Sequence, residues 1–192
     1  MLATHNSCTF KVATNKLYEL FHCIWRCQDK SLTEQYRSGV RFFDIRIYRK
    51  KNSWGFCHGK VNLYNGISDL FALYQVIRLQ YPDAKYRIVL EKYKDNSEIE
   101  LFKEEIEKCL ELFKDRVYQC IIKPGWVVVW NNNKMNYNII DNSWVPFTSD
   151  KPWYKQLSWK MFSTPKRWAK KHNHITQDEI DNESTIYFYD FV

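Results

Sequence analysis

Ionisable side chains recur at or just beyond the ends of the strands that the hydrophobic pattern predicts. His5 follows a short strand over residues 2–4, and His58 follows another over residues 54–57. A single histidine of this kind is usually structural. A group of such residues at the carboxyl ends of parallel strands lies where β/α barrels place their active sites. We expect one rim to collect His5, Asp44, Arg46, His58, Glu91, Asp141 and Asp190.

Two histidines with carboxylates and an arginine suit acid–base chemistry at a phosphodiester. A neutral histidine can take a proton from an attacking hydroxyl, and a protonated one can give a proton to the leaving oxygen. A guanidinium beside them stabilises charge on the phosphoryl oxygens. A carboxylate behind each histidine fixes its tautomer. The residue types therefore predict phosphoryl transfer by a histidine pair.

The stretch Gly39–Tyr48 is the element around which these residues are organised. It is a mostly apolar and aromatic strand that begins at a glycine. Side chains alternate along a strand, so Asp44 and Arg46 point the same way. Because an acid and a base are costly to bury, we expect both to line the mouth of a site rather than the core.

Strands and helices alternate along the rest of the chain. We expect strands over residues 2–4, 39–48, 54–57, 86–90, 126–130, 137–140 and 185–192, and helices over residues 15–27, 31–37, 67–81, 96–116 and 153–162, with a further one from Thr164-Pro165. This alternation predicts a parallel sheet with helices outside. The expected fold class is α/β, a compact (β/α) TIM-type barrel that is incomplete or distorted, with about seven recognisable strands in a single domain over residues 1–192.

Local patterns support several of these elements. Ser31 with Glu34, and Ser97 with Glu100, have the spacing of capping boxes at helix starts. In the segment 15–27 one apolar stripe, expected to face the core, is formed by Leu17, Leu20, Phe21, Ile24 and Trp25.

Three short motifs occur in a fixed order. They are Thr4-His5-Asn6-Ser7, the segment Ser31–Arg46 that ends in Gly39-Val40-Arg41-Phe42-Phe43-Asp44-Ile45-Arg46, and Cys57-His58-Gly59. Together they resemble the X-domain of phosphatidylinositol-specific phospholipase C. The closing Tyr189-Asp190-Phe191-Val192 is similar to the last strand of that family. The resemblance covers most of residues 2–92 and the last eight residues, and it implies a phospholipase C-like phosphodiesterase.

The resemblance assigns roles to five residues. It implies that His5 is the general base and His58 the general acid, with Asp190 orienting His5 and Asp44 supporting His58. Arg46 would bind the phosphate. The implied reaction is attack by a neighbouring substrate hydroxyl on its own phosphodiester, which gives a cyclic phosphate.

The identity of residue 46 bears on metal use. Calcium-dependent members of the family carry an acidic ligand there, so Arg46 implies the metal-independent branch. A calcium ion held through Asn6, Asp44 and Glu91 is the alternative. We favour no metal and no cofactor, because a cation beside Arg46 would be repelled, and we expect Glu91 to pair with Arg46 instead.

The substrate is less constrained than the chemistry. We expect contacts to it from Asn6, Glu91, Lys92, Trp130, Asp141 and Trp144. The implied reaction needs a cis vicinal hydroxyl, as in an inositol or a ribose. The partner is therefore a phosphoinositide or a nucleotide phosphodiester. A catalytically silent barrel that binds an anionic ligand is the alternative from another class, although a binding module needs no histidine pair.

The composition also limits which partners and which cellular setting we expect. The chain of 192 residues carries a formal net charge of +7, which favours anionic partners such as phosphates or an anionic membrane surface, or else is an ordinary solvated surface. We expect six free cysteines in a reducing, cytoplasmic setting. We also expect no signal peptide and no transmembrane segment.

Overall fold

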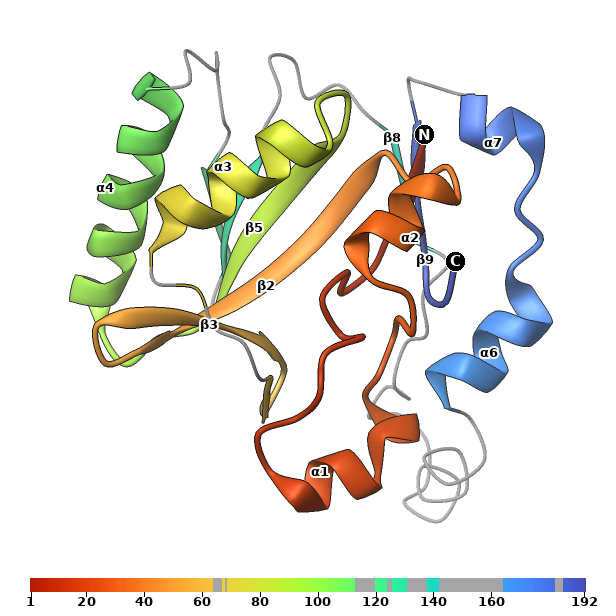
Figure 1. The fold of residues 1–192 in the computed structure, drawn as a ribbon, viewed down its shortest axis with the longest axis horizontal. Coiled ribbons are helices and arrows are strands. Elements are labelled where there is room, and N and C mark those ends of the chain that lie inside the picture. Colours follow the sequence, from red (N-terminus) through yellow and green to blue (C-terminus); the bar gives the residue numbers. More distant parts are fainter. Residues whose placement is uncertain are drawn as a thin grey trace.

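The computed structural model describes residues 1–63, 67, 69–112, 120–123, 126–130, 138–141, 164–181 and 185–192. Its strands are β1 (Leu2–Thr4), β2 (Phe42–Lys50), β3 (Ser53–His58), β4 (Val61–Asn62), β5 (Lys85–Lys92), β6 (Cys120–Lys123), β7 (Trp126–Trp130), β8 (Asn138–Asp141) and β9 (Thr185–Tyr189). Its helices are α1 (Lys16–Leu20), the 3₁₀ turn η1 (His22–Ile24), α2 (Leu32–Arg37), α3 (Leu70–Gln80), α4 (Asn96–Leu112), α6 (Pro165–His172) and α7 (Gln177–Asp181). Figure 1 shows their arrangement.

The strands form one mixed sheet in the order β6-β7-β5-β2-β1-β9-β8. Neighbouring strands are parallel from β5 through β2, β1 and β9 to β8. The expectation of an all-parallel sheet is wrong at two places. β7 runs antiparallel to β5 and β6, and β3 runs antiparallel to β2. Only two residues separate β2 from β3, and β6 from β7, and such short connections make hairpins rather than crossovers.

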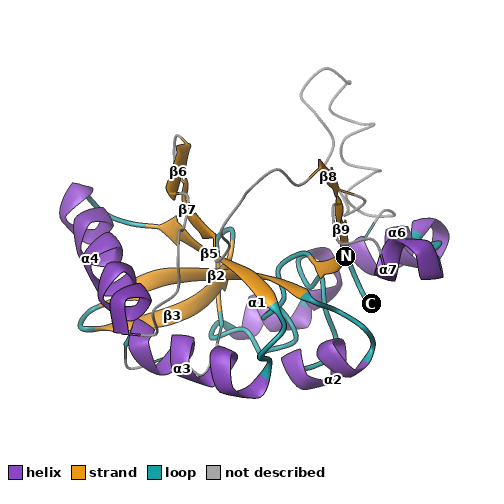
Figure 2. Cartoon of the chain, turned by 90° about the horizontal axis from the view of Figure 1, so that it is seen from above, coloured by secondary structure: helices purple, strands orange, loops and turns teal. Residues whose placement is uncertain are grey.

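The described sheet is curved and open. Among the described strands no pairing joins β6 to β8, the two ends of the sheet order. Figure 2 shows the sheet bending, with α2, α3 and α4 on its outer side. The α/β class is confirmed, and closure into a barrel stays a prediction.

Helix boundaries follow local sequence where caps are strong. Ser31 and Glu34 form the expected capping box of α2, and Thr164 caps α6 before Pro165. The capping box expected at Ser97 is wrong, because the Asp95 carboxylate accepts the hydrogen bonds at that helix start. The expected helix over residues 153–162 lies outside the described residues. None of the described helices is long and apolar enough to cross a bilayer.

The segment 15–27 departs most from expectation. It is not one helix but α1 followed by η1, and its apolar stripe faces outward. The exposed fractions are 62% for Leu17, 72% for Leu20, 49% for Phe21 and 43% for Ile24. Trp25 alone of that stripe is buried, and its indole N–H donates to the carbonyl of Tyr18 at 2.7 Å. Helical periodicity identifies an apolar face but does not show whether the core or solvent lies against it.

The two strands of the β2–β3 hairpin, which positions the site, approach each other closely at one point. Gly55 pairs with Tyr48 across the hairpin, and an added Cβ at Gly55 would lie 2.4 Å from the Tyr48 ring. We expect Gly55→Ala to lower the free energy of unfolding by about 1–3 kcal/mol, the usual cost of overpacking. Urea denaturation measures it, with Gln75→Ala on the exposed face of α3 as the control. Equal stability of the two variants would contradict the close approach.

Candidate active site

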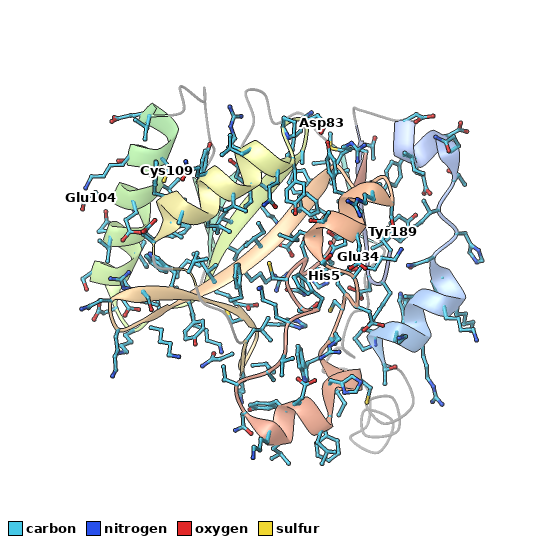
Figure 3. All side chains as sticks on the ribbon, in the orientation of Figure 1. His5, Glu34, Asp83, Glu104, Cys109 and Tyr189 are labelled. Atoms are coloured by element: carbon cyan, nitrogen blue, oxygen red, sulfur yellow. The ribbon has the colours of Figure 1, made fainter. Side chains whose placement is uncertain are left out.

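Five strands converge on the predicted residues. His5 directly follows β1, and Asp190 directly follows β9. Asp44 and Arg46 lie within β2, His58 ends β3, and Glu91 lies near the end of β5. Figure 3 shows His5 near the middle of the molecule, whereas Glu104 and Cys109 lie on the outer helix α4. The sheet therefore brings together residues that are up to 185 positions apart in sequence, as for His5 and Asp190.

The guanidinium of Arg46 is the centre of the cluster. Its Nε and Nη2 donate to Asp44 Oδ2 at 3.1 Å, and its Nη1 donates to Glu91 Oε1 at 2.8 Å. Its Nη2 also lies 2.8 Å from His5 Nε2. The expectation that Asp44 and Arg46 line an open mouth is wrong, because their exposed fractions are 0% and 5%. Mutual pairing is what permits their burial.

Asp44 is shared between two arginines. Arg87 Nε donates to Asp44 Oδ1 at 2.7 Å, on the oxygen that Arg46 leaves available. Burial alone would raise the pKa of Asp44, but the Arg46 and Arg87 guanidiniums outweigh it and hold that pKa well below its usual range. Asp44 is therefore a fixed negative charge, and it keeps Arg46 in place.

Glu91 joins Arg46 to the turn that carries His58. Its Oε1 accepts from Arg46, and its Oε2 accepts from the backbone N–H of Gly59 at 2.8 Å. The predicted pairing of Glu91 with Arg46 is present. Through Gly59 the same carboxylate also positions the end of β3.

The two histidines are held by different acceptors. His5 Nδ1 lies 3.1 Å from Asp190 Oδ1, and His58 Nδ1 lies 2.6 Å from the Trp25 carbonyl. A carbonyl can only accept, so His58 carries a proton on Nδ1, and its Nε2 is an acceptor when the ring is neutral. The same argument places the proton of His5 on Nδ1, because Arg46 donates to its Nε2.

The pKa of His58 is lowered to about 4. Burial of the ring is the largest cause, and the positive charge of Arg46 adds to it. At neutral pH the free protein therefore holds His58 as a neutral imidazole. The ring centroids of His5 and His58 are 6.3 Å apart, at an interplanar angle of 85°.

Asn6 lies between the two rings. Its Nδ2 is 3.0 Å from His5 Nε2 and 3.2 Å from His58 Nε2, and its backbone N–H donates to Asp44 Oδ2. Its φ of 50° is left-handed, a conformation that asparagine tolerates better than most residues. Its Oδ1 is buried and has no hydrogen-bond partner. Asn6 therefore presents an amide donor to both histidines.

The other predicted site residues are placed differently. Lys92 donates to Asn62 Oδ1 at 2.6 Å, and the register of β5 against β2 shifts at this point. Trp130 and Asp141 end β7 and β8, whose backbone alone is described, and Trp144 lies outside the described residues. The expected support of His58 by Asp44 is replaced in these contacts by the carbonyl of Trp25.

Sequence reasoning missed Arg87, Gln28 and Cys27. Arg87 lies two positions before Val89 and four before Glu91 in the predicted strand, so alternation could have placed it on the face of Glu91. Gln28 donates to the carbonyls of His5 and Tyr189, and Cys27 lies against Asn6. Gln28 and Cys27 belong to a loop, where no periodic pattern marks which side chains face inward.

The residues named for calcium do not fit a resident calcium ion. Asp44 gives its oxygens to Arg46, Arg87 and the backbone of Asn6, and Glu91 gives its oxygens to Arg46 and Gly59. Calcium takes six to eight oxygen ligands around one centre. Here a guanidinium lies between the two carboxylates, so the acceptors are directed at Arg46.

The chain was compared with known proteins. It is similar in fold to a phosphatidylinositol-specific phospholipase C of Listeria monocytogenes, with a TM-score of 0.61 and 16% sequence identity over 100% of this chain and 87% of that one. Two structures of the phosphatidylinositol-specific phospholipase C from Staphylococcus aureus align less well, with TM-scores of 0.38 and 0.42 and identities of 25% and 17%. The alignments span 58% and 97% of this chain, and 38% and 70% of the two Staphylococcus aureus chains.

No protein-family model and no curated protein matches the chain. The protein therefore has a fold like that of phosphatidylinositol-specific phospholipase C, in a divergent form.

The lowered pKa of His58 gives a pH dependence of stability. The unfolded histidine takes up a proton at about pH 6.5, whereas the folded one does so at about pH 4. Between these values the unfolded chain binds more protons, so stability falls as the pH is lowered. Between about pH 7 and pH 4.5 the free energy of unfolding should fall in both proteins. We expect the fall to be roughly 1–2 kcal/mol smaller in His58→Gln than in the unaltered protein.

Urea unfolding at the two pH values measures this difference. His174→Gln, which replaces an exposed histidine, is the control and should behave like the unaltered protein. An equal loss of stability in His58→Gln and the unaltered protein would mean that His58 titrates normally.

Proposed function

We propose that the protein is a metal-independent phosphodiesterase, a phosphoric diester lyase in which His5 and His58 act as base and acid. The observation that carries the proposal is the placement of two imidazoles 6.3 Å apart beside Arg46. One ring is backed by the buried carboxylate of Asp190. A phosphodiester between the rings would meet a base on one side, an acid on the other and a guanidinium alongside.

His5 supplies the base. Its Nδ1–H donates to Asp190, which leaves Nε2 as the atom that accepts the proton of the attacking hydroxyl. In the free protein that nitrogen accepts from Arg46 Nη2 instead. Binding of an anionic phosphate would draw the Arg46 donor onto a phosphoryl oxygen and release the base. The substrate itself thus activates His5.

His58 supplies the acid once a substrate is bound. The free protein keeps it neutral, because burial and the nearby cations oppose its protonation. The negative charge of a phosphodiester offsets those cations and raises the pKa of His58 toward neutrality. Its Nε2–H then protonates the leaving oxygen as the P–O bond to that oxygen breaks. Asn6 Nδ2, now facing His58 Nε2, would have to turn away or donate to the phosphate.

The substrate is a phosphodiester with a cis hydroxyl next to the phosphate. The attacking oxygen forms a new bond to phosphorus within the same molecule, which gives a cyclic phosphate and avoids the entropic cost of a second reactant. The similar solved structures are phosphatidylinositol-specific phospholipases C, so phosphatidylinositol is the proposed substrate. A ribose phosphodiester would satisfy the same chemistry.

Removing either ring should abolish turnover and leave the fold intact. Each acid or base contributes roughly 10²–10⁴-fold in rate, so we expect His5→Ala and His58→Ala to lose at least about 100-fold in kcat. His174→Ala, on the exposed side of the loop between α6 and α7, is the matched control. Full activity in either site variant would refute the acid–base assignment.

A substrate panel and a chelator separate the alternatives. Phosphatidylinositol and a set of ribonucleotide phosphodiesters are incubated with the protein, and release of a cyclic phosphate is followed. Cleavage confined to nucleotides would discard the lipid substrate, and tight binding without cleavage would indicate a silent binding protein. Chelation should leave the rate unchanged, and strong inhibition by a chelator would reverse the metal-independent assignment.

A membrane-facing surface accompanies the proposed substrate. The segment from α1 to η1 exposes the apolar side chains of Leu17, Leu20, Phe21 and Ile24, and α6 packs on η1. In Figure 1 α1 lies at the bottom of the view and α6 at the lower right. α6 exposes four cations and adjoins a cavity of about 420 Å³ that is lined in part by Lys166, Arg167 and Lys170. Apolar side chains flanked by cations suit an anionic lipid surface.

We expect Leu20→Ser to weaken binding to vesicles that contain phosphatidylinositol by roughly 5–30-fold, because it removes an apolar anchor worth about 1–2 kcal/mol. Leu79→Ser is the matched control, since Leu79 is equally exposed, at 72%, but belongs to α3. Sedimentation with vesicles measures both. Equal binding by the two variants would exclude α1 as the lipid-facing element.

A further inference from the structure

Beside the proposed base lies a set of side chains that the acid–base chemistry does not use in full. His5, Cys27 and Asp190 each offer one ligand atom, and the three atoms lie within 4.8 Å of one another. Nitrogen, sulfur and oxygen donors of this kind are the ligands that zinc takes in proteins. In a tetrahedral zinc site two ligand atoms are roughly 3.4–3.7 Å apart. Small side-chain rotations would therefore bring the three into range.

We propose that His5, Cys27 and Asp190 form an inhibitory site for zinc or a similar thiol-seeking divalent cation. The site uses His5 through Nδ1, the nitrogen that faces Asp190. Arg46 lies on the other side of the ring, at Nε2. The repulsion that argues against calcium among Asn6, Asp44 and Glu91 is therefore weaker here, because the ion sits across the imidazole from the guanidinium.

Charge balance also favours the site. The Asp190 carboxylate and a Cys27 thiolate would together offset the two positive charges of the ion. The backbone of Cys27 is already fixed, since its N–H donates to Thr9 Oγ1 at 3.0 Å and its carbonyl accepts from the Phe191 N–H at 2.7 Å. A ligand on an anchored backbone loses little conformational entropy on binding a metal.

Asn6 offers a fourth ligand. Its Nδ2 lies 3.7 Å from Cys27 Sγ and 3.1 Å from His5 Nδ1, while its buried Oδ1 has no partner. Rotation of the amide by half a turn would exchange these two atoms and direct the oxygen at the ion. The exchange gives up the Nδ2 contacts to the two Nε2 atoms, whereas Oδ1 has no hydrogen bond to lose. The unpaired oxygen is an independent sign of a ligand at this position.

Metal at His5 Nδ1 would stop the proposed catalysis through the tautomer. The single proton of the neutral ring moves from Nδ1 to Nε2 as the ion takes its place on Nδ1. Nε2 no longer has a free lone pair to accept the proton of the attacking hydroxyl. Cys27 releases its thiol proton to solvent in the same step. The effect on activity rests on the proposed function, whereas the binding of the metal does not.

The site is nearly closed, and this sets the expected kinetics. The exposed fractions of Cys27 and Asp190 are 2% and 0%, and the His5 side chain is 14% exposed. An ion must enter past His5 and turn the Asn6 amide. We expect inhibition to develop slowly after zinc is added and to reverse slowly when a chelator is added.

The test uses the full chain without a histidine tag, with Co²⁺ as a spectroscopic probe and Zn²⁺ as the inhibitor. The unaltered protein should bind one Co²⁺ with a thiolate-to-cobalt charge-transfer band in the near ultraviolet. Cys27→Ser should lose that band and need roughly 10–100-fold more zinc for the same inhibition. Cys27→Ala is measured in parallel, with circular dichroism to verify folding of each.

Two matched controls identify the thiol. Cys57→Ser replaces another buried cysteine near the site, whose Sγ lies 3.5 Å from Glu91 Oε2. Cys23→Ser replaces an exposed cysteine beside His22. Both should keep the band and the sensitivity to zinc. Loss of the band in either control but not in Cys27→Ser, or equal zinc sensitivity in all variants, would overturn the proposal. If the protein cleaves no phosphodiester, the cobalt band still decides the metal site.

Discussion

The ion cluster around Arg46 is the constraint on which the site depends. Asp44 accepts from Nε and Nη2 of the guanidinium and Glu91 accepts from Nη1, while Arg87 donates to the remaining oxygen of Asp44. Through these bonds the cluster joins β2 to β5, and Glu91 extends it to the turn after His58. Removing one partner of such a buried set leaves an unpaired charge, which typically costs about 3–5 kcal/mol. The cluster thus stabilises the sheet and fixes the geometry between the histidines.

The same cluster sets the resting state of both rings. Arg46 donates to His5 Nε2, and its charge contributes to the low pKa of His58. In the free protein the Nε2 atoms of both histidines are therefore already occupied, by Arg46 and by Asn6. Under the proposed function an anionic substrate changes both rings. It competes for the Arg46 donor and so frees His5 Nε2, and its negative charge raises the pKa of His58. The two nitrogens of His5 then have different roles. Nε2 faces Arg46 and the substrate, whereas Nδ1 faces Asp190 and would bind the proposed inhibitory metal.

Sequence could predict which residues meet but not how they are paired. Strand ends and alternation placed His5, Asp44, Arg46, Glu91 and Asp190 together, because those rules follow from backbone geometry. They could not predict that Asp44 and Arg46 would be buried, since that depends on Arg87 and Glu91 arriving from β5. The strands β3 and β7 were predicted, but their antiparallel direction and the outward face of α1 were not. Periodicity reports neither strand direction nor the surface opposite an apolar face. Trp25 and Cys27 come from a loop, where only the folded chain reveals which atoms point inward.

The central claim is that a hydroxyl of the substrate, not water, attacks the phosphorus. Phosphorus-31 NMR of phosphatidylinositol in mixed micelles, recorded during incubation with the protein, tests it most directly. A cyclic phosphodiester resonance should appear first and account for the substrate consumed. An acyclic phosphomonoester that appears from the start, with no cyclic intermediate, would contradict it.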